Sequence, residues 1–456
     1  MNKRTEQLIK LDKRYLWHPF TQMSDWLAAE PVIIEQGEGF YLIDTEGRRY
    51  IDGVSSLWCN VHGHRVGAID RAIGEQLNRI AHSTLLGLGQ SRSIELAEKL
   101  VQIAPEGLEK VFYSDSGATA VEIALKIAYQ YWQNLRESNR TRFIALREAY
   151  HGDTVGAVSV GGVELFHGIF KKLLFETYYV PSPHPYRFEG TADQCADYSL
   201  ENMEYLLKQN AGQIAAIVLE PLVQGAAGMI VHPSGFLKKA ADLARRYNVL
   251  LIADEVATGF GRTGRIFACE QEGVQPDLMC LAKGLTGGYL PLAATLATRQ
   301  VFDAFLGSRQ ENKTFYHGHT YTGNALACAA ALASLELFEE NKILASLPEK
   351  EALIEKSLKR MKDLPYVGDV RHRGLMAGIE LVRDKTTQEP FAWEQAVGAD
   401  VCAAMRLRGA MVRPLGNVIV LMPAPAMDQE TLQGLLDIVE CTIRQDLPSI
   451  VKGQGT

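Results

Sequence analysis

The chain has 456 residues, of which 47% are hydrophobic and 22% are charged, and its formal net charge is −7. This composition predicts a globular protein of two or three structural units and argues against a fibre or a disordered chain. The acidic balance argues against nucleic acid or an anionic membrane as a partner, because both select a basic face.

The cysteines and the N-terminus bear on where the protein works. Seven cysteines occur without any C-x-x-C spacing, which is typical of buried thiols in a reducing compartment. The first ten residues carry positive charge, but no apolar segment follows them, and no later stretch reaches membrane-spanning length. We therefore expect a cytoplasmic protein.

The sequence pattern divides the chain into three parts. Residues 1–64 contain short strands separated by glycines, and we expect them to pack with the C-terminal part and to form a wall of the site. Residues 65–335 alternate apolar strands with helices or loops, which predicts an α/β unit around a mostly parallel sheet. The predicted strands are 111–113, 143–146, 214–219, 249–253, 278–282 and 292–297. Residues 336–456 predict a smaller α+β unit, with strands at 375–382 and 418–422 and a helix at 393–408.

The first candidate ligand-binding feature is a turn at Ser116, Gly117 and Ala118, between a predicted strand and a predicted helix. Thr119 and Glu122 resemble a capping box, and apolar residues recur behind them at helical spacing. Backbone N–H groups at such a helix start can bind an anion, although many Ser-Gly turns only begin helices.

An aromatic residue follows the next predicted strand. Tyr150 precedes His151 and Gly152 at the end of strand 143–146. A tyrosine there can stack on a flat heteroaromatic ring, or it can pack on a neighbour at the sheet edge.

Two further strand ends carry charged groups that suit cofactor chemistry. Asp254 ends the apolar run that begins at Val249, and Lys283 follows the run 278–282 in a glycine-rich turn. Desolvation lowers the pKa of a lysine, and its amine can then form a Schiff base. Such a lysine together with a carboxylate for a pyridinium nitrogen indicates pyridoxal phosphate.

Two patterns point elsewhere. Residues 259–264 match G-x-G-x-x-G, which makes a nicotinamide-dependent dehydrogenase an alternative. However, Asp254 and Glu255 stand between strand and glycines, where a pyrophosphate would meet two negative charges. The pairs at 62 and 64 and at 317 and 319 resemble metal-binding histidines, but no third ligand lies nearby in sequence, so we expect no metal site.

Several motifs in the same order resemble those of the class III aminotransferases of fold type I. They are the turn at 116–118, the Tyr-His-Gly at 150–152, and the segments 220–225, 254–264, 283 and 318–320. Residues 16–23, 60–64, 150–154 and 413–416 are similar in particular to motifs of the 7,8-diaminononanoate synthases of biotin biosynthesis. The resemblance covers nearly the whole chain.

The resemblance implies a large domain that binds pyridoxal 5'-phosphate and a smaller α+β domain made from the C-terminal part and the N-terminal segment. It also implies a homodimer with active sites at the subunit interface. Lys283, Asp254 and Tyr150 are then the catalytic residues. The implied cofactor-binding residues are Ser116, Gly117, Ala118, Tyr150, His151, Asp254, Lys283, His319 and Thr320, with Thr320 reaching the phosphate from the partner subunit. The implied substrate-binding residues are Phe20, Leu57, Trp58, Tyr150, Lys283, Gly318 and Arg413.

The implied reaction moves an amino group from a donor to 8-amino-7-oxononanoate, with Arg413 holding the acceptor's carboxylate. Phe20, Leu57 and Val420 depart from the pattern of the adenosylmethionine-using enzymes, because two hydroxyls and an indole are missing. The donor is therefore S-adenosylmethionine or L-lysine. A broad ω-amino acid:pyruvate aminotransferase is the alternative within the family, and a non-enzymatic binding module is a third class, against which Lys283 and Asp254 argue.

Overall fold

A computed structural model describes residues 1–453 of the chain. Its larger unit is built around a sheet of seven strands in the order β4-β12-β11-β10-β7-β5-β6. The strands are β4 (Leu108–Ser114), β5 (Arg142–Leu146), β6 (Tyr178–Val180), β7 (Ile214–Leu219), β10 (Leu250–Asp254), β11 (Leu278–Leu281) and β12 (Ala293–Thr298). Strands β6, β5, β7, β10 and β11 run parallel, and only β12 is antiparallel to its neighbours, β11 and β4. The prediction of a mostly parallel sheet is confirmed, although the short strand β6 was not predicted.

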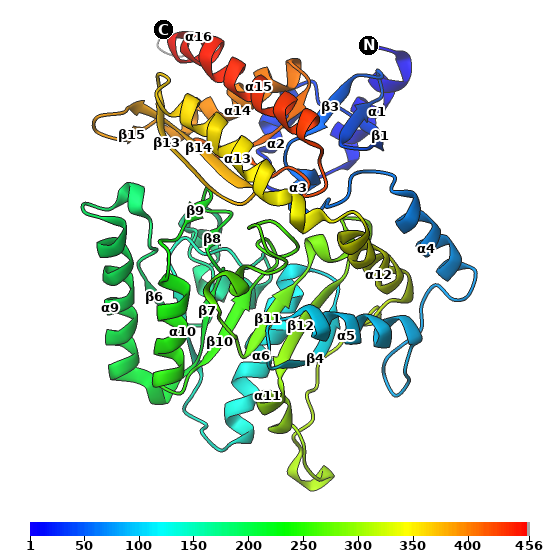
Figure 1. The fold of residues 1–456 in the computed structure, drawn as a ribbon, viewed down its shortest axis with the longest axis vertical. Coiled ribbons are helices and arrows are strands. Elements are labelled where there is room, and N and C mark those ends of the chain that lie inside the picture. Colours follow the sequence, from blue (N-terminus) through cyan, green and yellow to red (C-terminus); the bar gives the residue numbers. More distant parts are fainter. Residues whose placement is uncertain (454–456) are drawn as a thin grey trace.

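Helices cover both faces of this sheet (Figure 1). One face packs against α6 (Gly117–Asn134) and α11 (Arg299–Asp303), and the other against α5 (Ser91–Ile103), α9 (Ala192–Asn210), α10 (Phe236–Arg246) and α12 (Ala325–Glu340). Alternate residues of a strand join opposite cores, as Ile252 and Leu251 of β10 do. The middle strands are buried on both faces, which explains their continuous apolar sequences.

The amphipathic pattern of α6 explains its position. Val121, Leu125, Ala128 and Trp132 lie on its buried face, as the helical spacing predicted. Burial of a large apolar side chain contributes roughly 1.5–3 kcal/mol each. The prediction of a capping box at Thr119 and Glu122 was wrong, because Ser116 is the N-cap and pairs with Thr119, while the carboxylate of Glu122 accepts a hydrogen bond from the Gly156 amide at 2.7 Å.

The second unit combines the two ends of the chain (Figure 1). Its antiparallel sheet contains β13 (Val367–Arg373), β14 (Met376–Asp384), β18 (Val418–Leu421) and β17 (Arg413–Leu415), with β15 (Glu389–Pro390) beside β14. A second sheet joins β1 (Ile34–Glu38), β2 (Tyr41–Asp44) and β3 (Arg49–Asp52) to β16 (Ala410–Met411). Its helices include α1 (Lys3–Tyr15), α13 (Ile343–Lys362), α14 (Val397–Leu407), α15 (Gln429–Gln445) and α16 (Leu447–Gly453). The β3–β16 pairing supports our proposal that residues 1–64 belong structurally with 336–456.

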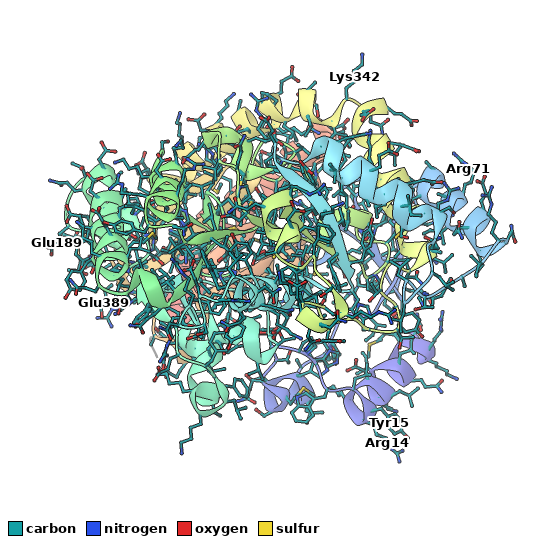
Figure 2. All side chains as sticks on the ribbon, turned by 90° about the horizontal axis from the view of Figure 1, so that it is seen from below. Arg14, Tyr15, Arg71, Glu189, Lys342 and Glu389 are labelled. Atoms are coloured by element: carbon teal, nitrogen blue, oxygen red, sulfur yellow. The ribbon has the colours of Figure 1, made fainter. Side chains whose placement is uncertain are left out.

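One predicted helix is interrupted. Residues 393–408 form a 3-10 turn, Trp393–Gln395, followed by α14, because Ala396 has a left-handed φ of 48°. Charged side chains such as Arg71, Glu189 and Lys342 project from the surface (Figure 2). Among residues 1–453, no helix combines the length and apolar character needed to cross a bilayer.

Candidate active site

The ends of the parallel strands open into a cavity of about 700 Å³. Seven of the nine residues expected to bind the cofactor line it: Ser116, Gly117, Ala118, Tyr150, His151, Asp254 and Lys283. Trp58, expected at the substrate, and Gly152 line it as well, and we call these nine residues the floor of the cavity. These residues come from five segments that are far apart in sequence. The strand order brings them together because carboxyl ends of parallel strands share one edge of the sheet.

Lys283 lies two residues beyond β11, at the start of a 3-10 turn, Lys283–Thr286. Desolvation lowers the pKa of its amine, which favours the uncharged, nucleophilic form. Its Nζ lies 5.4 Å from the centroid of the Trp58 ring. Behind it, Gly284 admits Phe260, since a Cβ at Gly284 would lie 2.8 Å from the Phe260 Cβ.

Asp254 and His151 form a buried pair. Asp254 Oδ2 lies 2.7 Å from His151 Nδ1, and Asp254 Oδ1 accepts a hydrogen bond from the Val256 amide at 3.1 Å. Burial by itself lowers the pKa of His151, but the hydrogen bond and charge of Asp254 outweigh burial and raise it. His151 Nε2 is buried and has no hydrogen-bond partner among residues 1–453. These hydrogen bonds fix the Asp254 carboxyl group at the cavity.

A second buried acid, Glu220, belongs to the segment 220–225 that resembles a family motif, but it was not predicted as a site residue. It directly follows β7, and its carboxylate accepts hydrogen bonds from the amides of Tyr150 at 3.1 Å and Gly225 at 2.9 Å. Burial raises its pKa to about 7. An acid directly after a buried parallel strand is the same signal that identified Asp254, so the sequence contained the information needed to find it.

The start of α6 lines the cavity. Gly117 and Ala118 belong to the first turn of this 18-residue helix, whose positive end attracts anions. The close approach of neighbouring segments requires glycine here. A Cβ at Gly117 would lie 2.5 Å from Val256 Cγ1, and a Cβ at Gly152, whose φ is +118°, would lie 2.4 Å from Ala118 Cβ.

Tyr150 forms an aromatic wall of the cavity. Its hydroxyl donates a hydrogen bond to Asp153 at 2.7 Å, and its ring lies nearly parallel to that of His167, 6.1 Å away. Phe166 meets Tyr150 edge-on at 6.3 Å and Phe20 at 5.2 Å. Phe20 is therefore connected to the cavity wall through Phe166. The sequence did not predict a role for Phe166, because no periodicity or motif marks that residue.

Residues 55–58 form a short left-handed turn at the cavity edge. The φ angles of Ser55, Ser56, Leu57 and Trp58 are 50°, 48°, 74° and 71°. Left-handed conformation costs roughly 1–2 kcal/mol for each residue that has a Cβ. Such a turn persists only where its surroundings hold it in place.

Arg262 supplies one such anchor from inside the glycine-rich segment that resembles a dinucleotide motif. Its buried guanidinium donates to the carbonyl oxygens of Trp58, Asn60 and Pro423 at 3.1, 2.9 and 2.7 Å, respectively. Burial lowers its pKa to about 10, so it stays charged at neutral pH. The glycines around it lead into a 3-10 turn, Ala268–Glu272, rather than a phosphate-binding helix, which removes the structural basis for a dinucleotide site.

Six predicted residues lie outside the cavity lining of this chain. Phe20, Leu57, Gly318, Thr320 and Arg413 are exposed, and His319 is half-buried, with Nδ1 accepting a hydrogen bond from the Tyr321 amide. Arg413, in β17, is close enough that its charge counteracts the rise that burial causes in the pKa of Tyr150. The structure therefore brings the floor residues together but leaves these six at or beyond the rim.

The paired histidines have protein partners. His62 bonds to Ser334 and His64 to Asp52, while His317 accepts a hydrogen bond from Lys126 at 3.0 Å. Within residues 1–453, no group of three or more His, Cys, Asp or Glu side chains is arranged to hold a metal ion.

Comparison with known proteins identifies the family. The family model for class III aminotransferases matches residues 23–443. The chain belongs to the class III aminotransferase family. The adenosylmethionine-8-amino-7-oxononanoate aminotransferase of Geobacter sulfurreducens is 53% identical over 442 residues, covering 96% of this chain and 98% of the relative. This family is pyridoxal phosphate dependent and has fold type I.

Solved structures agree. The crystal structure of the adenosylmethionine-8-amino-7-oxononanoate aminotransferase of Methanocaldococcus jannaschii has a TM-score of 0.92 at 48% identity, covering 96% of this chain and 99% of that one. The omega transaminase of Pseudomonas jessenii in complex with PMP has a TM-score of 0.93 at 31% identity, covering 98% of this chain and 99% of that one. The predictions of family, fold class and cofactor are thus confirmed.

The cavity suits pyridoxal phosphate. It offers an amine at Lys283, an acceptor for a ring N–H at Asp254, a flat wall at Tyr150 and free N–H groups at the start of α6.

Proposed function

We propose that this class III aminotransferase converts 8-amino-7-oxononanoate to 7,8-diaminononanoate, a step of biotin biosynthesis, with S-adenosylmethionine or L-lysine as the amino donor. The observation that carries the proposal is the convergence of Lys283, the Asp254–His151 pair and the α6 N-terminus in one cavity. The acceptor is supported by relatives of this name that are 48–54% identical to the chain over most of its length.

The proposed catalytic roles follow from these positions. Pyridoxal phosphate, when bound, supplies an electron sink for chemistry at an amine-bearing carbon. Lys283 would hold the cofactor covalently, and its free amine would be the base and acid that moves the proton of the amine-bearing carbon. Asp254 would keep the pyridine nitrogen protonated, and His151 fixes the orientation of the Asp254 carboxylate through the 2.7 Å hydrogen bond. The Tyr150 ring would stack on the cofactor ring.

The phosphate would be held by two sets of groups. Ser116, Gly117 and Ala118 offer the helix N-terminus. We propose that His319 and Thr320 complete the site in a homodimer, by reaching the phosphate of the other subunit. Their position outside the cavity of their own chain supports this assignment, as does the exposure of neighbouring Tyr316 and Tyr321, at 75% and 60%.

The substrate would lie between the cavity floor and the rim. Trp58 forms one wall, and Phe20, Leu57 and Gly318 line the approach. Arg413 would bind the acceptor's carboxylate through both oxygens, which its planar guanidinium permits. Its side chain forms no ion pair among residues 1–453, so it is available to a ligand carboxylate.

The rim also bears on the donor. Val420, opposite Arg413 in the β17–β18 pair, is buried and carries no hydroxyl. Phe20 and Leu57 likewise offer apolar surface in place of hydrogen-bonding aromatic groups. This set favours L-lysine, whereas the names of the relatives favour adenosylmethionine.

A half-reaction screen tests the proposal. The aldehyde form of the holoenzyme is mixed separately with adenosylmethionine, L-lysine, L-alanine and a terminal diamine, and the cofactor absorbance is followed by stopped flow. We expect L-lysine or adenosylmethionine to convert the cofactor. Conversion by alanine and simple ω-amines alone would favour the alternative, a broad ω-amino acid:pyruvate aminotransferase.

A further inference from the structure

The left-handed turn at residues 55–58 is held from two sides. At the first end, Ser55 Oγ donates a hydrogen bond to the Met422 carbonyl oxygen at 2.7 Å. At the other end, the Arg262 guanidinium donates to the carbonyl oxygens of Trp58 and Asn60. These contacts fix its two ends. Its strained centre, Ser56, is held by other residues.

Asp52 binds the centre of the turn through two hydrogen bonds from Ser56. Its Oδ1 accepts a hydrogen bond from the Ser56 amide at 2.9 Å, and its Oδ2 accepts one from the Ser56 hydroxyl at 2.7 Å. The carboxylate is buried, with 3% of the residue exposed. A buried carboxylate with two short hydrogen bonds to one residue fixes that residue's position strongly.

His64 fixes the carboxylate in turn. Its Nε2 lies 3.1 Å from Asp52 Oδ2, and its Nδ1 lies 3.2 Å from Asn60 Nδ2. The His64 backbone exchanges two hydrogen bonds with Gly39, at 2.6 and 3.2 Å. The ring also packs on Gly37, where a Cβ would lie 2.7 Å from His64 Cγ. The N-terminal sheet thus holds His64, which holds Asp52.

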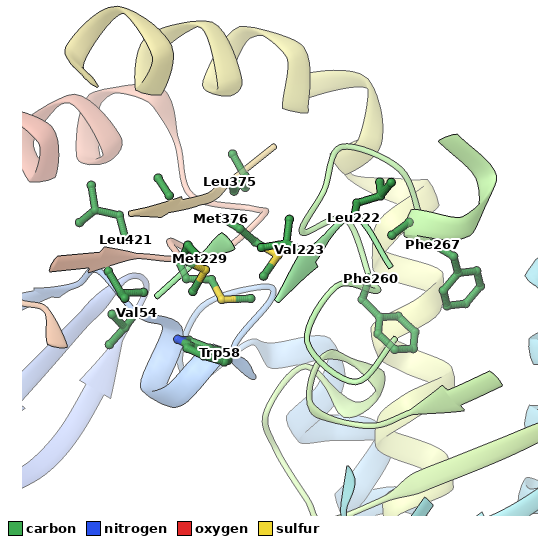
Figure 3. Packing of buried hydrophobic residues seen from close by; sticks show 14 of the residues in the cluster. Val54, Trp58, Leu222, Val223, Met229, Phe260, Phe267, Leu375, Met376 and Leu421 are labelled. Carbon is green, nitrogen blue, oxygen red and sulfur yellow. The ribbon is translucent and has the colours of Figure 1, made fainter. Parts of the chain in front are cut away.

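The turn determines where Trp58 lies. The Trp58 ring contacts the cavity beside Lys283 Nζ and packs on Gly225, where a Cβ would meet the ring at 3.2 Å. Figure 3 shows Trp58 below Met229 and Met376, with Val54 to its left. Leu57, the next residue back, is 52% exposed at the cavity edge. Relaxation of the turn would therefore move a wall of the cavity.

We propose that Asp52 and His64 are positioning residues for amino transfer: they hold residues 55–58 in the left-handed turn, and so keep Trp58 against the lysine and Leu57 at the rim. The inference rests on the proposed function for the identity of the substrate. It concerns residues that make no contact with the cavity themselves, since neither lines it.

Asp52 and His64 together form what we call the clamp on residues 55–58. Hydrogen exchange on cofactor-free protein tests this clamp directly. The amides of Trp58 and Cys59 are bonded within the turn, to Val54 O at 2.7 Å and Ser55 O at 3.0 Å. In Asp52→Ala, we expect the peptide covering 53–61 to exchange at least about tenfold faster, as loss of one charge-assisted hydrogen bond implies. His64→Gln should change exchange in the same direction by less. The control Asp44→Ala removes another buried aspartate of the same sheet and should leave this peptide unchanged.

Rescue by glycine separates positioning from general stability. Ser56 has a φ of 48°, which glycine adopts without steric cost. Alanine incurs the steric cost of its Cβ at this angle. Both replacements remove the Ser56 hydroxyl. In the Asp52→Ala background, Ser56→Gly should restore slow exchange and Ser56→Ala should not. For the holoenzyme, Asp52→Ala should raise the KM for 8-amino-7-oxononanoate about tenfold with a smaller change in kcat, and Ser56→Gly should reverse it.

The outcomes are distinct. Unchanged exchange and KM in Asp52→Ala, or equal behaviour of the glycine and alanine double variants, would overturn the clamp. If Asp52→Ala does not fold, His64→Gln is compared with the wild-type protein in the same way. Unchanged hydrogen exchange of the peptide 53–61 in His64→Gln would then overturn the clamp. Wild-type protein that fails to aminate 8-amino-7-oxononanoate would count against the proposed function, while the exchange result still decides the clamp.

Discussion

The floor and the rim of the cavity are built from different kinds of structure. Apart from Trp58, the floor residues follow β4, β5, β10 and β11, and the last three of these strands have a neighbour on each side in the sheet. The rim residues come from the N-terminal segment, from β17 and from the loop before α12, and most of them are exposed. This difference indicates that the floor determines the chemistry, which the family shares, and that the rim determines the substrate.

The largest effect should follow a change at the floor. Lys283→Ala should lower turnover by several orders of magnitude, because one residue supplies both the covalent link and the proton transfer. The protein should still fold and bind the cofactor noncovalently through the α6 start. Turnover and near-ultraviolet circular dichroism measure the two effects. Substantial residual turnover would show that another group moves the proton.

The second prediction concerns Asp254, which we propose to face the ring nitrogen of the cofactor. Asp254→Asn should lower turnover by about a hundredfold or more, because a neutral amide does not hold the pyridine nitrogen protonated. The matched control is Asp277→Asn, since Asp277 is a half-buried aspartate beside the same strand that bonds to the Leu251 amide at 2.8 Å. Near-normal rates for Asp254→Asn would mean that the ring lies elsewhere.

The third prediction addresses the rim. Arg413→Ala should weaken the acceptor by about 2–5 kcal/mol in kcat/KM, the loss typical of removing one member of a desolvated charge pair. The lysine half-reaction should also slow if the donor carboxylate uses the same arginine, whereas an adenosylmethionine half-reaction should change less. Arg408→Ala, which breaks an exposed pair with Asp446, is the control. Unchanged acceptor kinetics would remove this carboxylate site.

The fourth prediction is a pH dependence of stability at the floor. The pKa of Glu220 is raised to about 7 by burial, so the folded protein keeps a proton that the unfolded chain releases near the ordinary glutamate pKa of 4.5. The unfolding free energy of the cofactor-free protein should therefore fall as pH rises from 4.5 to 7. Glu220→Gln should remove up to about 3 kcal/mol of that fall. Denaturant titrations across this range measure it, and parallel curves for both proteins would refute the shift.

The smallest effect should come from aromatic groups at the rim. Leu57→Trp combined with Phe20→Tyr should improve the adenosylmethionine half-reaction by a few fold, about the contribution of one stacking or hydrogen-bond contact. Leu165→Trp, at a 62% exposed position two residues before His167, controls for the added indole. Brisk wild-type reaction with adenosylmethionine and none with lysine would refute the donor inference from Phe20, Leu57 and Val420.

The same contrast explains what the sequence could predict. Asp254 and Lys283 follow continuous apolar strands, and such strands place their ends at one edge, so local sequence locates both residues. Phe166 and Asp52 act through side-chain contacts that exist only in the folded chain, and no local sequence pattern marks these two residues. The left-handed turn was also missed, since Ser55 to Trp58 contain no glycine. Long-range contacts with Arg262 and Met422, together with hydrogen bonds to the nearby Asp52, hold this turn.

The most direct measurement of the proposed function is product formation by the purified holoenzyme. Wild-type protein and Lys283→Ala are incubated with 8-amino-7-oxononanoate and either L-lysine or S-adenosylmethionine, and 7,8-diaminononanoate is quantified by mass spectrometry, with pyruvate as a competing acceptor in a parallel reaction. We expect wild-type protein to form the diamine with at least one donor and to prefer 8-amino-7-oxononanoate over pyruvate, and the variant to form none. Efficient amination of pyruvate without formation of 7,8-diaminononanoate would contradict the proposal.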